Sequence, residues 1–507
     1  MRSSFFHLCS FLAIMLLLQP IAGFAGSDEL AVQSRVPRFT LEQAILTGLQ
    51  RNPDIQRAKQ EIERAKGLYL ELRADALPRV DAGGSFTDTD PHLNNFRGDG
   101  GSGVVIDPVT GQAFGGGSSG VERQYNFNLR ATQIVFAGGR VVSQIRSADF
   151  QRDSAYFGFR DTIDAVIAMV RTQFYQILLN RALIGVQEQS IRLLESQLQD
   201  QQNRFDAGTV PRFNVLQAQV ALSNQQPELI SARNNYRIAQ LQLARTIGLD
   251  FDPARGDAAP LEAVGTLRYE PRSIPLVKAI EVAKERRPFL QQQKANVLNS
   301  NAQVGVARSG YFPQISANGG TDFRSSPRSE AIRDVRSGYV LGATGSWAIW
   351  DWGQTYGRVK QAKAVLQQSK ILLDDVGRQV ELEVQQAYSN IVQGRELIRS
   401  QQETVGQAEE ALRLSSARLS AGAGTQLEVL NARVEVTRAQ SISLQALFTY
   451  NAAVAEFDRV TATEITYANA LDEPRTRDKV SSEAAATPPP KPTPLPLNGA
   501  GNRQPAR

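Results

Sequence analysis

The 507-residue sequence has very few metal-binding or redox-active side chains, with one cysteine and two histidines. Cys9 lies in an N-terminal stretch, 1–25, that has a charged residue, an apolar core and a small-residue cleavage site, as a signal peptide does. Cys9 begins that apolar core instead of following the cleavage site, so we expect no lipid anchor. After cleavage the chain has no cysteine and one histidine, His92, which excludes disulfides and thiolate metal sites.

Long apolar runs and one-sided charge are also missing. Beyond the signal segment no stretch reaches the ~18 apolar residues of a membrane helix, which leaves an exported soluble protein or a β-barrel. The 56 basic and 51 acidic residues are spread along the chain, and no basic block with interleaved aromatics predicts nucleic-acid binding. There is no phosphate-loop signature, and paired acids such as Asp374 and Asp375 lie in helical heptads, where solvation explains them. We expect no catalytic, cofactor or metal site.

What the sequence does contain is an internal repeat. One set of residues recurs 214 positions later without a gap, and an upstream set recurs 235 positions later, so a single 21-residue insertion separates them. Long elements that pack along their whole length tolerate few insertions, because each one would shift the packing register. The repeated residues include Tyr125, Arg204, Gly208, Val215, Leu216 and Tyr236, which recur as Tyr339, Arg418, Gly422, Val429, Leu430 and Tyr450.

Each copy reads as a short helix, a proline, a strand, a loop, a second strand, a glycine turn and two long helices joined by another glycine turn. Apolar residues recur every seven positions from Ile163 to Phe205, and in the second copy from Val384 to Leu419 after the exception Gly377. This spacing predicts long helices wound around neighbours. Pro227 should kink or end the returning helix of the first copy, whereas its counterpart is Ser441.

Four segments alternate between apolar and polar residues with period two, as strands do. Each is close to the ~9–11 residues of a tilted membrane-crossing strand; the edge of a soluble sandwich is the alternative. The expected organisation is a signal peptide 1–25, a first repeat 26–248 (strands about 79–89 and 121–136, hairpin about 139–248), a linker 249–273, a second repeat 274–465 (strands about 314–323 and 339–350, hairpin about 353–462) and a disordered, proline-rich tail 466–507. The Gly-rich stretch 97–120 reads as a surface loop.

Four membrane strands cannot close a barrel, because single-chain barrels start at about eight strands. An open sheet would leave backbone groups unpaired in lipid, at several kcal/mol each. The strands must therefore be pooled among chains, and strand arithmetic alone permits two chains or three.

The chain resembles the TolC family of outer-membrane channel proteins from signal cleavage to about residue 465. The resemblance rests on motifs that occur in order in both copies. They are the Leu-x-x-Ala…Asn-Pro opening at Leu41, Ala44, Asn52 and Pro53, the strand-to-helix turns 135–139 and 349–353, and the hairpin turns 204–218 and 418–432.

The resemblance implies a mixed α and β fold: a transmembrane β-barrel of four strands per chain, twelve per homotrimer, continuous with a long α-helical barrel of coiled-coil hairpins and a small mixed equatorial region. It implies the exit duct of a tripartite efflux or type I secretion system in the outer membrane of a Gram-negative bacterium, extending into the periplasm. The implied partners are outer-membrane lipid, a periplasmic adaptor, and an inner-membrane ABC or proton-driven transporter. No nucleic acid is implied. The rival interpretation is a periplasmic coiled-coil protein without a pore.

The same resemblance assigns site residues. Glu428 matches the first of two pore-lining carboxylates, Asn431 stands where the second would be, and Asn214 holds the related position in copy one, so we expect a weaker cation preference than in family members with two acidic rings. A solvated glutamate without a pore role is the alternative. The tip turns Gly208, Thr209, Gly422 and Ala423 would dock the adaptor, although a purely structural turn explains the glycines equally well. Ordinary packing likewise competes with an interfacial aromatic belt of Phe136, Trp347, Trp350 and Trp352.

Overall fold

The computed structural model describes residues 36–88, 104–106, 113–115, 123–250, 260–272, 275–325 and 335–463. The signal segment 1–25, His92 and the tail 466–507 lie outside the described residues. So does most of the Gly-rich stretch 97–120, in which only the backbones of β3 (Val104–Ile106) and β4 (Ala113–Gly115) are described, as an antiparallel pair. All that follows concerns the compact unit Arg38–Arg507.

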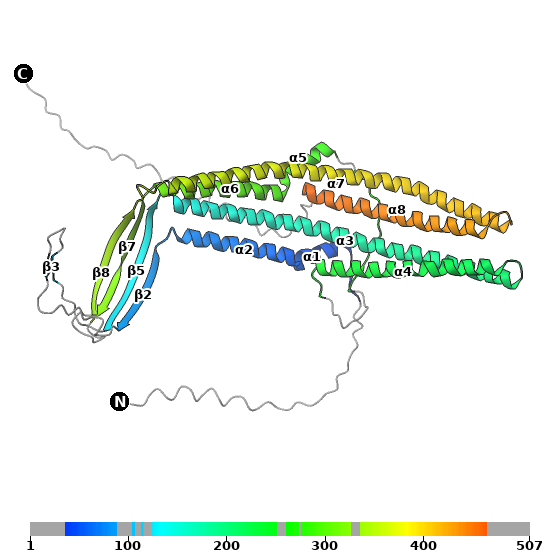
Figure 1. Cartoon of the computed structure of the whole chain (residues 1–507), viewed down its shortest axis with the longest axis horizontal. Helices are drawn as coiled ribbons and strands as arrows, with labels where there is room; N and C mark the ends of the chain where they lie inside the picture. Colours follow the sequence, from blue (N-terminus) through cyan, green and yellow to red (C-terminus); the bar gives the residue numbers. More distant parts are fainter. Residues whose placement is uncertain are drawn as a thin grey trace, which may run out of the picture. The chain divides into compact units, whose positions relative to one another are not determined.

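The main sheet contains four antiparallel strands in the order β2-β5-β7-β8 (Figure 1). Their bounds are β2 (Arg79–Asp88), β5 (Arg123–Ala137), β7 (Gln314–Ser325) and β8 (Val335–Ser346). Within the described residues, the outer edges of β2 and β8 carry no strand. A bulge between Ile134 and Phe136 shifts the register of β5 against β7.

The strand register places residues of one kind on the same face of the sheet. Gly84 lies opposite Phe127, Phe127 opposite Phe323, and Gly319 opposite Leu341, so the apolar positions of all four strands share one face, the apolar face. The polar positions share the other, the polar face, which carries Asp81, Asn128, Arg130, Asn318, Asp322 and Thr344. Large side chains of the apolar face are open to solvent in the single chain, with Tyr339 82% and Leu341 77% exposed.

The fourth strand differs from its predicted bounds. The alternation indicated a strand at about 339–350, but β8 begins at Val335 and ends at Ser346. Ser346 pairs with Gln314, the first residue of β7, and Pro313 before it has no N–H to donate. The prediction that the strand continues to residue 350 was wrong, because the sequence pattern of one strand does not reveal where its partner stops.

Eight α-helices cover the described part of the two repeats, four in each. In the first they are α1 (Leu41–Arg51), α2 (Pro53–Ala74), α3 (Arg140–Asp206) and α4 (Arg212–Thr246). In the second they are α5 (Leu276–Arg286), α6 (Pro288–Arg308), α7 (Gln354–Ser420) and α8 (Gln426–Thr461). No helix of the described segments is both long enough and apolar enough to span a membrane.

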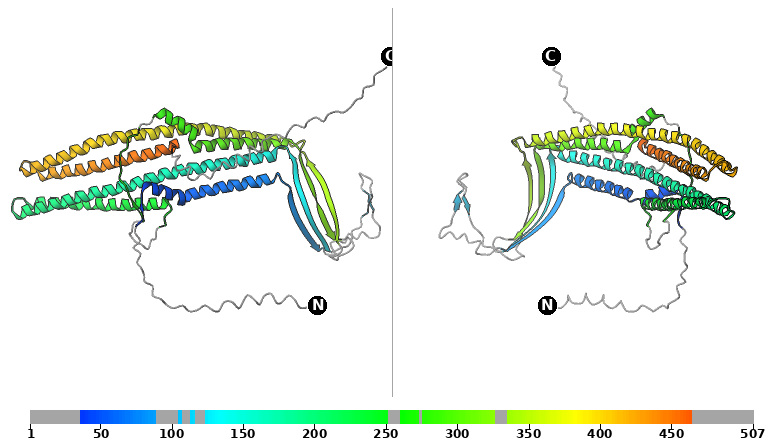
Figure 2. Two further views of the ribbon diagram at one scale, coloured as in Figure 1. Left: turned by 180° about the vertical axis from the view of Figure 1, so that it is seen from behind. Right: turned by 45° about the vertical axis from the view of Figure 1, so that its right-hand side comes forward.

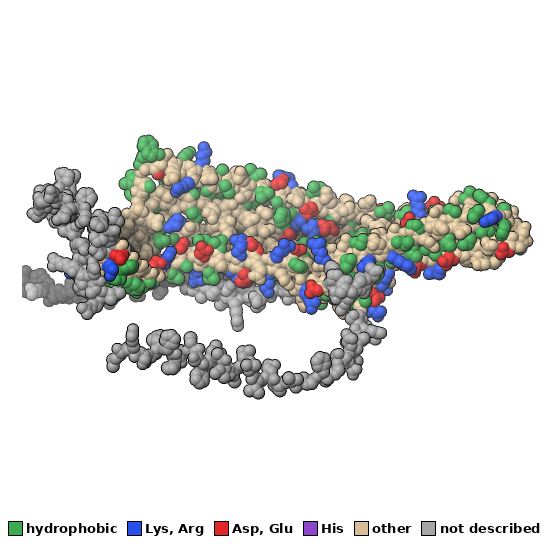
Figure 3. All heavy atoms as spheres, turned by 60° about the horizontal axis from the view of Figure 1, so that its bottom comes forward, with side chains coloured by type: hydrophobic (Ala, Val, Ile, Leu, Met, Phe, Trp, Pro, Cys, Tyr) green, Lys and Arg blue, Asp and Glu red, His purple; other side chains and the backbone are tan. Residues whose placement is uncertain are grey.

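The helices lie side by side in the order α2, α3, α6, α7, with α4 paired to α3 and α8 to both α7 and α3 (Figures 1 and 2). Both α3 and α7 have 67 residues, which at 1.5 Å per residue is about 100 Å each. In Figure 3 charged side chains of both signs are interspersed along the helices, and hydrophobic side chains gather toward the hairpin ends. The exposed ones include Phe213, Leu216, Leu427 and Val434.

Each repeat also has a helix that the sequence pattern did not separate from the short first one. α2 begins directly after α1, where Asn52 accepts hydrogen bonds from the backbone N–H groups of Asp54 and Ile55, and Pro53 occupies the first helical position. α2 buries only Ile55 and Ala65, so it has almost no apolar stripe to detect. Its sequence signal was the Asn-Pro pair itself, a cap followed by a helix-starting proline.

The seven-residue spacing corresponds to a buried seam over only part of each long helix. Ile163, Val170 and Ile177 are buried in the core of the first repeat, and Val384, Ile391 and Ile398 in that of the second. Toward the hairpin turn of α3 the buried positions shift to Leu194, Gln197 and Gln201, and Phe205 is exposed. One chain therefore covers its own seam near the middle and leaves apolar surface uncovered near the turns.

α4 continues through Pro227 instead of ending there. Contacts to α3 hold it on both sides of the proline: Gln225 donates to Gln187, and Arg233 pairs with Glu188 at 2.9 Å. Pro227 is itself exposed, so its ring occupies space on the solvent side and does not displace a side chain of the core.

The segment expected to be a linker contributes to the core. β6 (Glu262–Ala263) pairs in parallel with β1 (Arg38–Phe39), and Leu261 and Ala263 are fully buried among the helices of the first repeat. Further along, Arg272 donates to Asp458 of α8 at 2.7 Å. The connection between repeats is thus fixed to both of them.

Candidate functional site

The two hairpin turns have the same backbone hydrogen bonds. Thr209 N–H donates to Arg204 at 2.9 Å and Gly208 N–H to Phe205 at 2.8 Å; in the second turn Ala423 donates to Arg418 at 2.9 Å and Gly422 to Leu419 at 3.1 Å. This is the Schellman arrangement, which requires positive φ at the glycine. Gly208 has φ +72° and Gly422 φ +74°, and apart from the adjoining chain no described residue has an atom within 4 Å of where either would carry a Cβ.

The turn of the second repeat carries a paired carboxylate. Thr425 caps α8 by accepting from the N–H of Glu428 at 3.3 Å, and the Glu428 carboxylate lies 3.5 Å from the guanidinium of Arg418. Arg418 also donates to the carbonyl of Ala423 at 3.2 Å. Asn431 is exposed one turn further along α8. The sequence argument treated Glu428 as an unpaired charge and missed Arg418, although the repeat itself offered the arginine.

The first-repeat turn has the same arginine and a different partner. Arg204 pairs with Asp200 of its own helix at 3.1 Å. Asn214, at the position equivalent to Glu428, is neutral and half-buried in the first turn of α4. α4 begins after Pro211, which provides no side-chain cap. The structure therefore places Asn214 and Glu428 in the first turns of the two returning helices and Asn431 one turn further along α8, and of the three only Glu428 is paired with an arginine.

The two hairpins touch near their turns through polar contacts. Gln201 of α3 donates to Gln426 of α8 at 3.3 Å, and both side chains are buried. Further from the turns, Arg433 donates to the backbone carbonyl of Leu193 at 2.7 Å. Burial lowers the pKa of the Arg433 guanidinium. These polar contacts join the two hairpins with little apolar area, and they keep the two turns at the same level along the long helices.

At the other end of the long helices, aromatic side chains surround the strand-to-helix turns. Phe136 lies in β5, whereas Trp347, Trp350 and Trp352 follow the end of β8 and are 57%, 75% and 89% exposed. Trp347 donates to the carbonyl of Tyr311 at 3.1 Å, and the rings of Trp350 and Trp352 meet edge to face at 5.7 Å. Three large indoles held outward in this way form a surface that suits a membrane interface.

Backbone geometry at this junction depends on glycine and on one cap. Gly139 and Gly353, with φ near +80°, precede α3 and α7. Asp351 accepts from Thr355 N–H at 2.7 Å and Gly353 N–H at 3.0 Å, and its hydrogen bonds, chiefly to Thr355, lower its pKa. α3 has no equivalent side-chain cap.

A charged network joins the helices midway between these two ends. Asp458 of α8 is buried and pairs with Arg171 of α3 at 3.1 Å and with Arg272. Arg287, 5% exposed at its side chain, bonds Glu383 of α7. Burial opposes ionisation of Glu383, but the hydrogen bond and charge of Arg287 outweigh it and lower its pKa. Burial raises the pKa of nearby Asp161 on α3, with Arg287 partly offsetting it.

None of these groups forms a reactive constellation. Among the residues that the structure describes, no three His, Cys, Asp or Glu side chains are placed to hold a metal ion. The polar and ionic contacts hold the helices in register.

Comparison with known proteins gives a consistent result. A model of the outer membrane efflux protein family matches residues 45–249 and 279–463, one copy in each repeat. The chain is 23% identical over 410 residues to the toluene efflux pump outer membrane protein TtgC of Pseudomonas putida, covering 79% of this chain and 78% of that protein. It is also 23% identical over 316 residues to the alkaline protease secretion protein AprF of Pseudomonas aeruginosa, covering 62% and 63%.

Solved structures show the same fold. The Campylobacter jejuni CmeC outer membrane channel superposes with a TM-score of 0.71 at 15% identity, covering 88% of this chain and 89% of that one. CusC gives 0.68 at 16% identity, with 83% and 91% covered. The mixed α and β, TolC-like fold class predicted from the sequence is confirmed.

Proposed function

The chain belongs to the outer membrane efflux protein family, and we propose that three copies of it form the duct through which a tripartite efflux or type I secretion system releases cargo across the outer membrane. One similar protein exports toluene and another secretes a protease, so the family relationship leaves the cargo open between small molecules and proteins.

The observation that carries this proposal is the four-stranded open sheet. Its apolar face suits lipid, its polar face suits water, and within the described residues no strand pairs with the outer edges of β2 and β8. In a bilayer those edges must be paired, and three copies would supply twelve strands, an even number within the range of closed barrels. Pairing of β2 with β8 of the next copy would close the barrel.

Uncovered apolar side chains near the hairpin ends support association of the helices as well. Phe213, Val220, Ile230 and Val434 are each more than half exposed in the single chain. A soluble helix rarely leaves such a stripe to water, and a neighbouring hairpin would bury it. Three copies bring twelve helical strands together, which is the helical half of the duct.

The partners follow from the two ends of the long helices. We assign Gly208, Thr209, Gly422 and Ala423 to contact with a periplasmic adaptor, which joins an ABC or proton-driven transporter of the inner membrane. Both turns are exposed and have the same backbone shape, so six similar sites would face the partner.

At the membrane end, Phe136, Trp347, Trp350 and Trp352 would contact outer-membrane lipid. At the tips, Glu428, Asn431 and Asn214 would line the constriction of the pore. Because Arg418 lies beside Glu428, this constriction carries weaker negative charge than three free carboxylates would give.

Fractionation and electrophoresis test the duct against a periplasmic rod. We expect the protein in the outer-membrane fraction, as an oligomer that survives cold detergent and dissociates on heating, and single channels in planar bilayers. A soluble periplasmic protein that forms no channel would contradict the proposal and favour the rod.

A further inference from the structure

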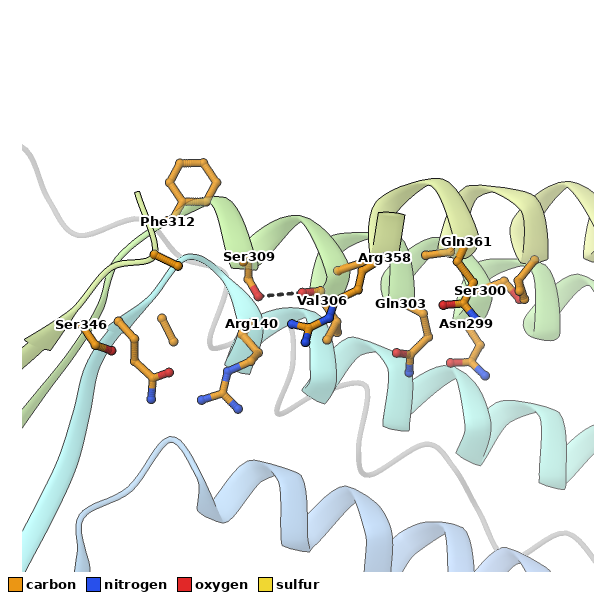
Figure 4. A pocket seen from close by; sticks show the side chains of 17 residues that line it. Arg140, Asn299, Ser300, Gln303, Val306, Ser309, Phe312, Ser346, Arg358 and Gln361 are labelled. Atoms are coloured by element: carbon orange, nitrogen blue, oxygen red, sulfur yellow. Dashed lines mark hydrogen bonds between the residues drawn. The ribbon is translucent and has the colours of Figure 1, made fainter. Parts of the chain in front are cut away.

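A cavity of 730 Å³ lies where the sheet joins the helices (Figure 4). It is lined by the first turns of α3 and α7, the last turns of α6, the 3-10 turn η2 (Ser309–Tyr311) and the adjoining ends of β7 and β8. No aspartate or glutamate is among its lining residues, but two arginines are. The cavity is therefore electropositive.

The arginines come from two different helices and converge. Arg140 is the first residue of α3, and in Figure 4 Arg358 reaches from α7 across the last turns of α6 toward it. Within the described part of the chain neither forms an ion pair or hydrogen bond. The polar sheet face differs: Arg79 pairs with Asp81 at 2.9 Å and Arg324 with Asp322 at 2.8 Å.

Helix ends strengthen the positive potential. The N-terminal turn of α3 has no side-chain cap, and the positive end of its dipole lies at Arg140. The C-terminal end of α6 is also here, where the Ser309 hydroxyl donates to Val306 at 2.6 Å and the Ser309 N–H reaches carbonyls of the same turn. These bonds reduce the number of α6 carbonyls that are left to repel an anion.

The rest of the lining is mixed: the polar side chains of Asn299, Ser300, Gln303 and Gln361 lie among apolar ones that can contact the apolar part of a ligand. Small apolar side chains lie beside the arginines: Ala137, Val306, Ala307, Ala362 and Val365. Gln314 and Ser346 pair with one another on the polar sheet face, so the cavity adjoins the face that lines the pore in the proposed duct. The repeat places glutamine at both counterpart positions, Gln354 for Arg140 and Gln144 for Arg358. The two arginines therefore belong to this cavity and are not repeated at the counterpart positions of the other copy.

We propose that this cavity binds amphiphilic organic anions, with the carboxylate or sulfonate held by Arg140 and Arg358 and the apolar part against α6 and α7. The proposal rests on the proposed function in placing the cavity on the route of the cargo. Guanidinium groups bind planar oxyanions through paired, charge-assisted hydrogen bonds, which explains the choice of head group.

The test uses the full-length protein purified in detergent and 2-naphthoate as probe, with 2-naphthamide as its uncharged twin. Binding is measured by equilibrium dialysis for the wild type, for Arg140→Gln/Arg358→Gln and for the control Lys360→Gln/Lys363→Gln. The control removes the same charge from exposed positions of α7 outside the cavity lining. A heat-sensitive oligomer band checks assembly of each variant.

We expect the arginine double variant to bind 2-naphthoate about tenfold more weakly or worse, and the lysine double variant to bind it as the wild type does. 2-Naphthamide should bind weakly and equally to all three. Equal naphthoate affinity in the wild type and the arginine variant, or the same loss in the lysine variant, would overturn the site. Single-channel recordings separate the two proposals. Binding that depends on the arginines, in a protein that forms no pore, would contradict only the proposed duct. A conducting pore without arginine-dependent binding would contradict only the proposed anion site.

Discussion

The Arg418–Glu428 pair sets the charge of the proposed constriction. The two side chains lie 3.5 Å apart, and both are largely solvated, at 61% and 42% side-chain exposure. Exposed pairs of this kind contribute little to stability, about 0–1 kcal/mol, so the functional effect should exceed the structural one. The arginine neutralises part of the field that a carboxylate ring would create.

This gives opposite expectations for the two partners. Arg418→Gln should raise the preference of the channel for cations, because it leaves Glu428 unpaired, and Glu428→Gln should lower it. Reversal potentials in a salt gradient measure both. If Glu428→Gln left selectivity and divalent block unchanged, Glu428 would be a solvated residue with no role in the pore.

The turn glycines allow a test with an internal control. Gly208→Ala and Gly422→Ala should each destabilise by about 1 kcal/mol, because alanine is strained at positive φ although space for its methyl group exists. Gly185→Ala and Gly406→Ala lie in α3 and α7 with equally open surroundings, and should stabilise by up to ~1 kcal/mol. Thermal unfolding compares the four; a common sign would refute the backbone explanation. Adaptor crosslinking to assembled Gly208→Ala trimers tests docking separately.

At the scale of elements, α4 and α8 are counterparts that differ at one proline. Pro227 is tolerated because it is exposed and α4 is held to α3 on both sides of it. Its counterpart Ser441 lies in the interior of α8, where its hydroxyl donates to Thr437 at 2.8 Å.

Exchanging the two residues should act in opposite directions. Ser441→Pro removes a helical N–H and should cost about 3 kcal/mol, whereas Pro227→Ser restores one and should stabilise. Melting of the detergent-solubilised protein measures both. An equally stable Ser441→Pro variant would mean that α8 bears little of the stability of its hairpin.

The charged network between α3, α6, α7 and α8 gives a pH-dependent comparison. Because the pKa of Asp161 is raised in the folded protein, its contribution to the free energy of unfolding is most favourable at pH values below its pKa in the unfolded chain. That contribution is lost as the pH rises through its pKa in the folded protein. Asp161→Asn should therefore raise the melting temperature at pH 7 by roughly 1–3 °C, with the difference vanishing below about pH 4.

Glu383 behaves in the opposite way. Because the pKa of Glu383 is lowered in the folded protein, the ionised side chain stabilises the fold at pH values above its pKa in the unfolded chain. That stability is lost as the pH falls through its pKa in the folded protein. Glu383→Gln leaves the buried Arg287 without its carboxylate and should cost about 3 kcal/mol at pH 7. Melting curves of the Asp161 and Glu383 variants from about pH 3 to 8 test both expectations; a stabilising Glu383→Gln would contradict the assigned role of Arg287.

The sequence predicted the elements that have a local, repeating pattern, and it did not predict features that depend on contacts between distant residues. The seven-residue spacing of apolar residues indicated α3 and α7, and glycines marked both hairpin turns, because these signals are local. The end of β8 could not be predicted, since it depends on where β7 begins. The Arg418–Glu428 pair was hidden because the two residues meet only across the folded turn. α2 was missed because a helix with two buried residues has no clear apolar period.

At the scale of the whole molecule, the two repeats supply equal hairpins with unequal details. α3 and α7 have the same length, so both hairpins can end at one level and contact each other through Gln201 and Gln426. The differences lie at Asn214 against Glu428 and at Pro227 against Ser441. In the proposed trimer these positions would reduce six similar hairpins to three pairs, and gating and partner choice should depend on them.

Crosslinking of the sheet edges tests the central claim, that three copies pool their strands. The sequence after Cys9 has no cysteine, so Ser85→Cys in β2 can be combined in turn with Gly338→Cys, Val340→Cys, Gly342→Cys and Thr344→Cys in β8, all on the polar face. At the matching register, oxidation in outer membranes should give a ladder that ends at the covalent trimer and collapses on reduction. A ladder that ends at the dimer, or no crosslink at any register, would contradict the twelve-stranded barrel.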